Sequence, residues 1–223
     1  AAADEQALRL DEERARAFAR RFADMHAEVA LGQYLDIAAE QTPLDPERSD
    51  VLNVSDALEV ALHKSAHYSV VHPAILGAIC GASTLDDGEA LARSLEEILT
   101  PWGLAFQLRD DDLGVFGDPA VTGKPAGDDL REGKRTVLLA LTWEASSPAE
   151  RSALTEVLGV AEASPERLSA ATRIVEANGR APHEAEIARL VADGHAALEA
   201  SSFDDGARAM LRELCAILTA RRA

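Results

Sequence analysis

Apolar residues recur along most of the chain at the spacing of an α-helix. In the N-terminal stretch they follow one another mostly at intervals of three, four and seven, at Leu8, Ala15, Phe18, Phe22, Met25, Val29 and Tyr34. This spacing places them on one face and predicts a helix from Asp4 to about Glu40. Gly32 lies inside the pattern, where glycine costs about 1 kcal/mol relative to alanine. Thr42-Pro43 ends the helix.

The same period continues downstream. Ser55 and Thr84 are expected to cap two further helices, and Pro101 must kink the second of these or begin a new segment. The helices that the pattern predicts after the first cover residues 55–71, 74–82, 84–113, 135–145, 148–159, 165–178 and 183–220, the last broken near Gly206, with a glycine-rich structured loop at 114–135. No segment has the period-two alternation of a strand. We therefore expect a single all-α domain over residues 1–223.

Composition narrows the possible functions. The 22 Lys and Arg residues against 39 Asp and Glu residues give a net charge of −17, which argues against binding to nucleic acid or to an anionic membrane. Cys80 and Cys215 are too few for a disulfide scaffold or a thiolate metal site, which fits a reducing cytoplasm. No apolar run approaches the roughly 18 residues of a transmembrane helix. We expect a cytoplasmic protein without a transmembrane segment.

Lysine is rare in this chain. Only three of the 22 basic residues are lysines, namely Lys64, Lys124 and Lys134, and the other 22 − 3 = 19 are arginines. Such a bias usually reflects genome composition, and lysines that survive it are candidates for roles that need a compact, mobile ammonium group. Chance is the alternative explanation.

Three adjacent aspartates, Asp110 to Asp112, lie near the end of the long predicted helix. The negative end of the helix dipole disfavours them there, and neighbouring positions point about 100° apart, so the three cannot share one face. Asp110 and Asp111 follow Gln107 by three and four residues, so each shares a face with it. Mg²⁺ takes oxygen ligands and would relieve the repulsion. A solvated acidic helix end is the alternative.

A glycine-rich turn follows and places two of the lysines close to these aspartates. Its sequence is Thr122-Gly123-Lys124-Pro125-Ala126-Gly127-Asp128-Asp129-Leu130-Arg131-Glu132-Gly133-Lys134. Ammonium groups near metal-bound carboxylates suit a diphosphate, which bridges the metal and the lysines. The spacing is not that of a P-loop. A simple surface turn explains the glycines but not the lysines.

Two upstream segments add polar side chains. Lys64 and Ser65 lie on the predicted helix 55–71, whereas Gln33 and Asp36 share one face of the first helix. Read alone, each would be a solvated surface group.

Together these strings resemble the trans-prenyl diphosphate synthase (polyprenyl synthetase) family, of the geranylgeranyl diphosphate synthase type. The resemblance rests on four strings in the family's order: Gly32-Gln33-x-Leu35-Asp36, Lys64-Ser65 with Tyr68-Ser69, Phe106-Gln107 through Asp111, and Thr122-Gly123-Lys124 with Gly133-Lys134. They are similar, in turn, to the family's Gly-Gln-x-x-Asp helix, its Lys-Thr-x-x-Tyr-Ser segment, its second aspartate-rich motif and its two downstream diphosphate lysines. All three lysines fall on phosphate positions of the family.

The resemblance implies a helical bundle of the isoprenoid synthase type and a Mg²⁺-dependent condensation of an allylic diphosphate with isopentenyl diphosphate. It also implies a homodimer. By resemblance, Mg²⁺ is held by Asp36, Asp110 and Asp111; the substrates are bound by Lys64, Ser65, Gln107, Lys124 and Lys134; and the catalytic residues are Lys64, Asp110, Asp111 and Lys124.

One departure concerns the second motif. The family's usual Asp-Asp-x-x-Asp ends here in Gly114, and Asp118 begins the string Asp118-Pro119-Ala120-Val121-Thr122-Gly123-Lys124-Pro125. This form resembles geranylgeranyl-type synthases, so we expect Asp110 and Asp111 to suffice and the product to be geranylgeranyl diphosphate.

The second departure is larger. The family's first aspartate-rich motif is not in this sequence, and Asp86-Asp87 cannot replace it, because no Arg-Arg follows and the string comes after Lys64. Since Ala1 is not a methionine, we expect that the N-terminal part of the domain has been removed. A non-catalytic regulatory subunit of a heteromeric synthase is the alternative. A terpene cyclase is set aside, because Leu113 and Gly114 stand where its metal motif needs Ser or Thr.

Overall fold

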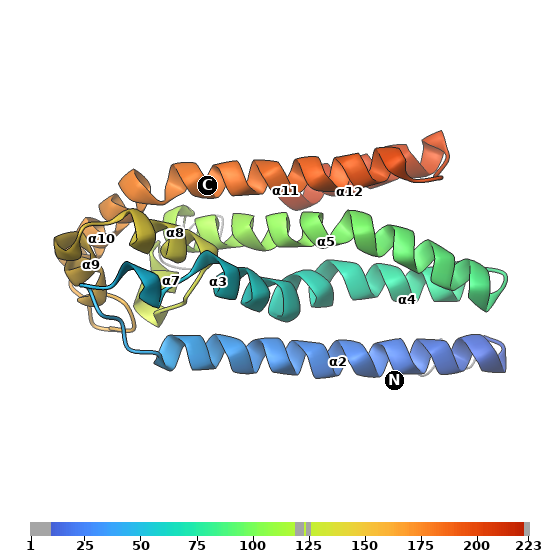
Figure 1. Cartoon of the computed structure of the whole chain (residues 1–223), viewed down its shortest axis with the longest axis horizontal. Coiled ribbons are helices and arrows are strands. Elements are labelled where there is room, and N and C mark those ends of the chain that lie inside the picture. The colour runs from blue at the N-terminus through green and yellow to red at the C-terminus, as the bar shows by residue number, and fades with distance from the viewer. Residues whose placement is uncertain (1–9, 119–122, 124–125, 221–223) are drawn as a thin grey trace.

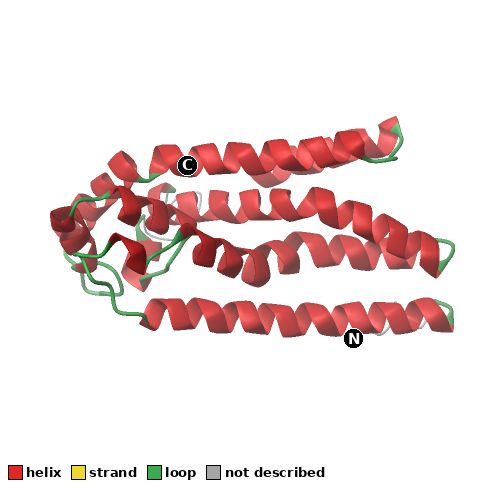
Figure 2. Cartoon of the chain, viewed as in Figure 1, coloured by secondary structure: helices red, strands yellow, loops and turns green. Residues whose placement is uncertain are grey.

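The computed structural model describes residues 10–118, 123 and 126–220. Every regular element in these ranges is a helix (Figure 2), which confirms the predicted all-α fold. The elements are α2 (Glu12–Gln41), η1 (Ser49–Val51), α3 (Val54–Ala61), η2 (Leu62–Val71), α4 (His72–Gly81), α5 (Leu85–Phe116), α7 (Asp128–Glu132), α8 (Val137–Ala145), α9 (Pro148–Thr155), α10 (Pro165–Asn178), α11 (Arg180–Ala200) and α12 (Asp205–Thr219). None of the described helices has both the length and the apolar character that crossing a bilayer requires.

Helix α5 is the centre of the bundle. It packs against η2 and α4 on one side and against α11 and α12 on the other, while α2 covers η2 and α4. Figure 1 shows these long helices lying side by side, with α7 to α10 gathered at one end. Buried Trp102 of α5 donates a hydrogen bond to the Val191 carbonyl of α11 over 3.2 Å, which ties the two helices together.

Several helix ends differ from the predicted ones. Asn53, not Ser55, caps α3, because its side chain accepts a hydrogen bond from the Asp56 backbone N–H over 2.7 Å. Thr84 caps α5 as predicted. The N-terminal helix begins at Glu12; residues 4–9 of the predicted helix lie outside the described part.

The long central helix also differs in extent. It runs through Pro101 to Phe116 without a new start, and Figure 1 shows a bend in its axis. The break near the C-terminus lies at 201–204, ahead of Gly206, and the predicted loop 114–135 contains the short helix α7.

The segment predicted as one helix over 55–71 changes from an α-helix to a π-helix at its middle. Residues 62–71 form a π-helix, a rare form that is frequent at functional sites. Gly32 of α2 lies against it so closely that a Cβ there would be 2.4 Å from the Lys64 backbone nitrogen. Its lack of a side chain therefore allows α2 and η2 to touch, which explains a glycine inside a helix.

Candidate active site

A polar cavity of about 210 Å³ lies between α2, α3, η2, α5 and the segment that follows α7. Its lining includes seven of the predicted site residues, Asp36, Lys64, Ser65, Gln107, Asp110, Asp111 and Lys134, together with Asp129, Arg135 and Thr136. Lys124 lies outside the described residues. Four separate parts of the sequence thus bring aspartates and cations to one place.

Lys64 and Asp36 meet across the contact between α2 and η2. The Lys64 ammonium donates to the Asp36 carboxylate, and the two form an ion pair at the cavity wall. Asp36 is one turn beyond Gly32, so the close approach at the glycine brings the carboxylate within reach of the lysine. The pair keeps an ammonium group in the cavity where an anionic ligand can replace its partner.

Asp111 is one of two buried carboxylates of the cavity, the other being Asp129. The Asp111 side chain accepts a hydrogen bond from Gln107 Nε2 over 2.8 Å, and the residue is 6% exposed. Burial raises the pKa of Asp111 to about 8, with Asp129 and Asp110 adding to the rise and the Gln107 hydrogen bond and Lys134 opposing it. A divalent cation would relieve the cost of ionising this group.

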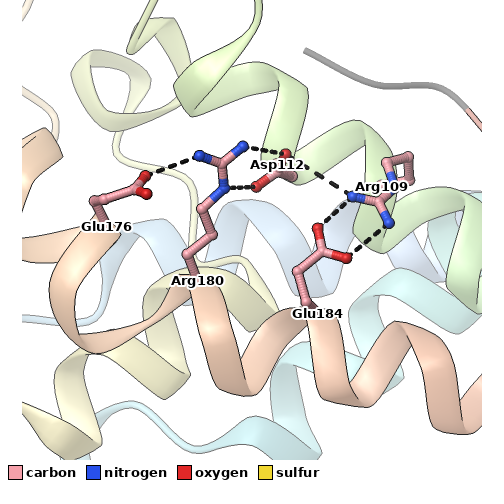
Figure 3. A network of polar contacts seen from close by, with 5 residues as sticks. All are labelled: Arg109, Asp112, Glu176, Arg180 and Glu184. Atoms are coloured by element: carbon pink, nitrogen blue, oxygen red, sulfur yellow. Dashed lines mark hydrogen bonds and ion pairs between the residues drawn. The ribbon is translucent and has the colours of Figure 1, made fainter.

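The three adjacent aspartates separate, as their angular spacing requires. Asp110 is exposed and Asp111 is buried, and both line the cavity. Asp112, which is 1% exposed, instead accepts from Arg180 Nε over 3.1 Å and lies 4.0 Å from the Arg109 guanidinium. Figure 3 shows this network, in which the outer carboxylates of Glu176 and Glu184 complete the pairing of the two arginines. Asp112 therefore joins α5 to α11.

Lys134 is a second ammonium group in the lining of the cavity. It forms ion pairs with Asp129 and, over 2.9 Å, with Glu132. Burial opposes the charged ammonium, but the hydrogen bonds to the two carboxylates outweigh this and raise the pKa of Lys134, so it stays cationic.

Asp129 is a cavity residue that the sequence analysis missed. A Cβ on Gly114 would lie 1.9 Å from Asp129 Oδ2, so the Asp129 carboxylate occupies the space beside the motif position that departs from the family pattern. The feature that could have pointed to it is Gly127-Asp128-Asp129, a turn followed by two acids at a helix start, with Gly127 at a φ of 75°.

Arg135 is the second residue that was missed. Its guanidinium lines the cavity and donates to the Gly133 carbonyl over 2.7 Å and to the Glu40 carbonyl over 3.3 Å. Burial lowers the pKa of Arg135, although arginine still carries its charge at neutral pH. The wall of the cavity therefore includes a third cation.

The donor set fits Mg²⁺. The lining offers the carboxylates of Asp36, Asp110, Asp111 and Asp129, and hard oxygen ligands of this kind are those that Mg²⁺ prefers. Burial raises the pKa of Asp111 to about 8, as expected for an acid that lacks a full counter-charge. Cations and carboxylates on one wall suit a ligand that carries both a metal and phosphate groups.

Known protein families and sequences include relatives of this chain. Residues 5–175 match the family described as Polyprenyl synthetase. The chain is 33% identical over 163 residues to a geranylfarnesyl diphosphate synthase of Aeropyrum pernix, covering 73% of this chain and 46% of the relative. It is 31% identical over 214 residues to a (2E,6E)-farnesyl diphosphate synthase of Mycobacterium bovis, covering 92% of this chain and 55% of that relative. The chain thus spans about half the length of these relatives.

A solved structure has the same fold. The crystal structure of geranylgeranyl pyrophosphate synthase from Corynebacterium glutamicum, complexed with isoprenyl diphosphate and magnesium, superposes with a TM-score of 0.82 at 40% identity. The match covers 96% of this chain and 57% of that one. The helical bundle is therefore of the type that the sequence resemblance implied.

Proposed function

Since the chain belongs to the polyprenyl synthetase family, we propose that its protein is a Mg²⁺-dependent prenyltransferase that joins an allylic diphosphate to isopentenyl diphosphate. The observation that carries the proposal is the cavity, which collects aspartates and lysines from segments as distant in sequence as Asp36 and Lys134.

The proposed roles follow from the chemistry of each side chain. Asp36, Asp110 and Asp111 hold the metal, with Asp129 nearby. Lys64 and Lys134 donate hydrogen bonds to the diphosphate, and Lys124 is proposed as a third donor. These charged donors stabilise the negative charge that develops as the carbon–oxygen bond breaks. When bound, Mg²⁺ would neutralise the leaving diphosphate further.

Two neutral groups are proposed to assist. The Ser65 hydroxyl, next to Lys64, can donate to a phosphate oxygen. Gln107 orients the Asp111 carboxylate through its amide N–H, and its amide oxygen can face a developing carbocation. Both side chains line the cavity.

We further propose geranylgeranyl diphosphate as the product. The support is Gly114 in the aspartate-rich motif and the 40% identity to the Corynebacterium protein. The relatives include synthases of farnesyl, geranylgeranyl and geranylfarnesyl diphosphate, so product analysis decides the chain length.

A cytoplasmic homodimer completes the proposal. Leu31, Tyr34 and Ile37 are 51%, 67% and 50% exposed at helical spacing on α2, which supports contact with another surface. Sedimentation analysis of the purified full-length polypeptide should give twice the chain mass; a monomer across the micromolar range would contradict the dimer.

A regulatory subunit is the second candidate. It is favoured by one observation: the sequence contains one aspartate-rich motif of the pair that the family uses. A non-catalytic subunit would retain part of the site and alter the product of a complete partner.

The assay that separates the two uses the full-length polypeptide with Mg²⁺, farnesyl diphosphate and labelled isopentenyl diphosphate. If the protein is an enzyme, it forms labelled geranylgeranyl diphosphate without a partner protein. Lys124→Ala is then expected to lower the turnover by about 100-fold or more while the helical circular dichroism is unchanged. Residues 1–223 alone are expected to give no product, since they lack the other motif. Product from the full-length polypeptide only when a partner synthase is added would favour the regulatory subunit.

A further inference from the structure

Three histidines of one helical segment converge on a single glutamate of α2. His63 Nδ1 and His67 Nδ1 lie 2.6 Å and 2.5 Å from Glu28 Oε1. His72 Nε2 lies 2.6 Å from Glu28 Oε2. Half of the six histidines in the chain thus surround one carboxylate. These four residues are not among those that line the cavity described above.

The π-helix produces this convergence. In an α-helix, residues five apart such as His67 and His72 would point about 140° away from each other. The i→i+5 hydrogen bonding of a π-helix widens the turn and returns such residues to one face. Segment 62–71 is π-helical and His72 follows it directly, so all three rings turn toward α2.

The close contact at Gly32 completes the cluster. Glu28 is one turn before this glycine on α2, which lies directly against the backbone of η2 at His63 and Lys64. The ring centroids of His63 and His67 are 5.9 Å apart, and those of His67 and His72 are 5.7 Å apart, in edge-on arrangements. The rings therefore lie one after another, edge to face, along the contact between the two helices.

The donor chemistry differs from that of the aspartate-lined cavity. Imidazole nitrogens suit Zn²⁺ and its neighbours in the first transition series, whereas Mg²⁺ takes oxygen. Ligand atoms of Glu28, His67 and His72 all lie within 4.8 Å of one another. Tetrahedral zinc with bonds of about 2.05 Å separates its ligand atoms by about 3.3 Å, so small side-chain rotations can close the set.

Both oxygens of the Glu28 carboxylate face histidine rings. Burial acts to raise the pKa of Glu28, but hydrogen bonds with His72, His63 and His67 outweigh it and lower the pKa to about 2. A metal would replace these hydrogen bonds, because a ring nitrogen that binds a metal cannot also carry a proton.

We propose that Glu28, His67 and His72, with His63 as the fourth ligand, form a binding site for a transition-metal dication of the zinc class. The metal would tie α2 to η2 next to Lys64 and so fix the helix that carries it. This inference does not rest on the proposed prenyltransferase activity, because the ligands are separate from the cavity residues.

The test is a titration of the full-length polypeptide with ZnCl₂ after removal of metal by a chelator, in the presence of millimolar Mg²⁺. We expect one saturable site per chain and, with Co²⁺ as the probe, the intense visible absorption of four-coordinate cobalt. Glu28→Gln and His67→Ala should each weaken zinc binding by about 100-fold, since loss of even an outer-sphere partner costs 10- to 100-fold.

Two matched variants serve as controls. His26→Ala removes an exposed histidine of the same helix, and Asp111→Asn removes a cavity carboxylate; both should bind zinc as the wild type does. If a ligand variant fails to fold, carbethoxylation of the wild type mapped by mass spectrometry decides instead: zinc should protect His67 and His72 but not His26. The proposal would be overturned if no saturable zinc binding were found. It would also be overturned if the Glu28 and His67 variants bound zinc as the wild type does and zinc did not protect His67 and His72.

Discussion

Asp111 and Asp112 are consecutive residues of α5, yet their carboxylates belong to two separate parts of the molecule. Asp111 accepts from Gln107 over 2.8 Å at the cavity, whereas Asp112 accepts from Arg180 Nε over 3.1 Å between α5 and α11. The rotation of about 100° per residue separates them. Ligand binding and stability can therefore be altered independently by changing one or the other.

Asp111→Asn is expected to stabilise the metal-free protein at pH 8 and to abolish its stabilisation by Mg²⁺. Burial raises the pKa of Asp111 from 3.8 to about 8, so the folded state holds a proton that the unfolded chain releases. The contribution of the protonated carboxyl to the free energy of unfolding is fully present below pH 3.8 and is lost as the pH rises through about 8. The amide avoids that loss, and we expect a Tm increase of about 3 °C or more.

Thermal unfolding between pH 5 and pH 9, with and without Mg²⁺, measures both effects. Asp24→Asn, a change at an exposed aspartate of α2, is the control and should follow the wild type throughout. A variant at Asp111 that keeps the wild-type response to Mg²⁺ would remove this residue from the metal site.

Asp112→Asn is expected to destabilise the protein and to leave its stabilisation by Mg²⁺ unchanged. The substitution removes the buried negative charge that lies between Arg180 and Arg109. Each arginine still has one ion-pair partner, Glu176 for Arg180 and Glu184 for Arg109 (Figure 3). Loss of one partner of such a buried group should lower the free energy of unfolding by about 3 kcal/mol. Urea denaturation measures this, and the Mg²⁺ response should remain. A variant as stable as the wild type would show that the network contributes nothing net.

Gly32→Ala tests whether the contact of α2 with η2 positions the cavity. Alanine favours a helix by about 1 kcal/mol, but its Cβ would be 2.4 Å from the Lys64 nitrogen and 2.7 Å from the Lys64 Cα. Because these are backbone atoms, the helices must separate, and we expect a net loss of about 2 kcal/mol together with weaker diphosphate binding.

Gly77→Ala is the matched control for this substitution. Gly77 is also inside a helix, α4, but a Cβ there meets no atom within 4 Å. This variant should gain about 0.5–1 kcal/mol in urea denaturation. Equal effects of the two substitutions would mean that the close contact is not important.

Gly114→Ala is expected to disturb Lys134 through Asp129. The new methyl group would overlap Asp129 Oδ2, and the other oxygen of that carboxylate, Oδ1, pairs with the lysine, so both groups must move. We expect the affinity for inorganic diphosphate in Mg²⁺ to fall by about tenfold, since a lost charge-assisted hydrogen bond is worth about 1.5 kcal/mol or more. Calorimetric titration measures it. Unchanged affinity would show that Asp129 does not position Lys134 for the ligand.

The sequence predicted the helices well because local rules govern them. The apolar period and the caps, such as Thr84, depend on residues close in the chain. The aspartate triplet could likewise be divided in advance, since its angular spacing is a property of the helix itself.

What could not be predicted depends on contacts between distant segments. The π-helix over 62–71 shows the same apolar pattern as an α-helix, and its packing against Gly32 is a tertiary contact. Asp129 enters the cavity because α7 lies beside Gly114 of α5, and Arg135 lines the same cavity a few residues further on. The zinc-class ligands were missed because His67 and His72 are five residues apart, a spacing that does not share a face of an α-helix.

The central claim is that the aspartates and lysines of one cavity bind a diphosphate together with magnesium. Its most direct test is calorimetric titration of the full-length polypeptide with a non-hydrolysable allylic thiodiphosphate, with and without Mg²⁺, for the wild type and for Lys64→Ala. We predict binding that requires Mg²⁺ and weakens at least tenfold in the variant, because a charge-assisted partner of the diphosphate is lost. An affinity for the thiodiphosphate that changes neither when Mg²⁺ is left out nor when Lys64 is replaced would contradict the account.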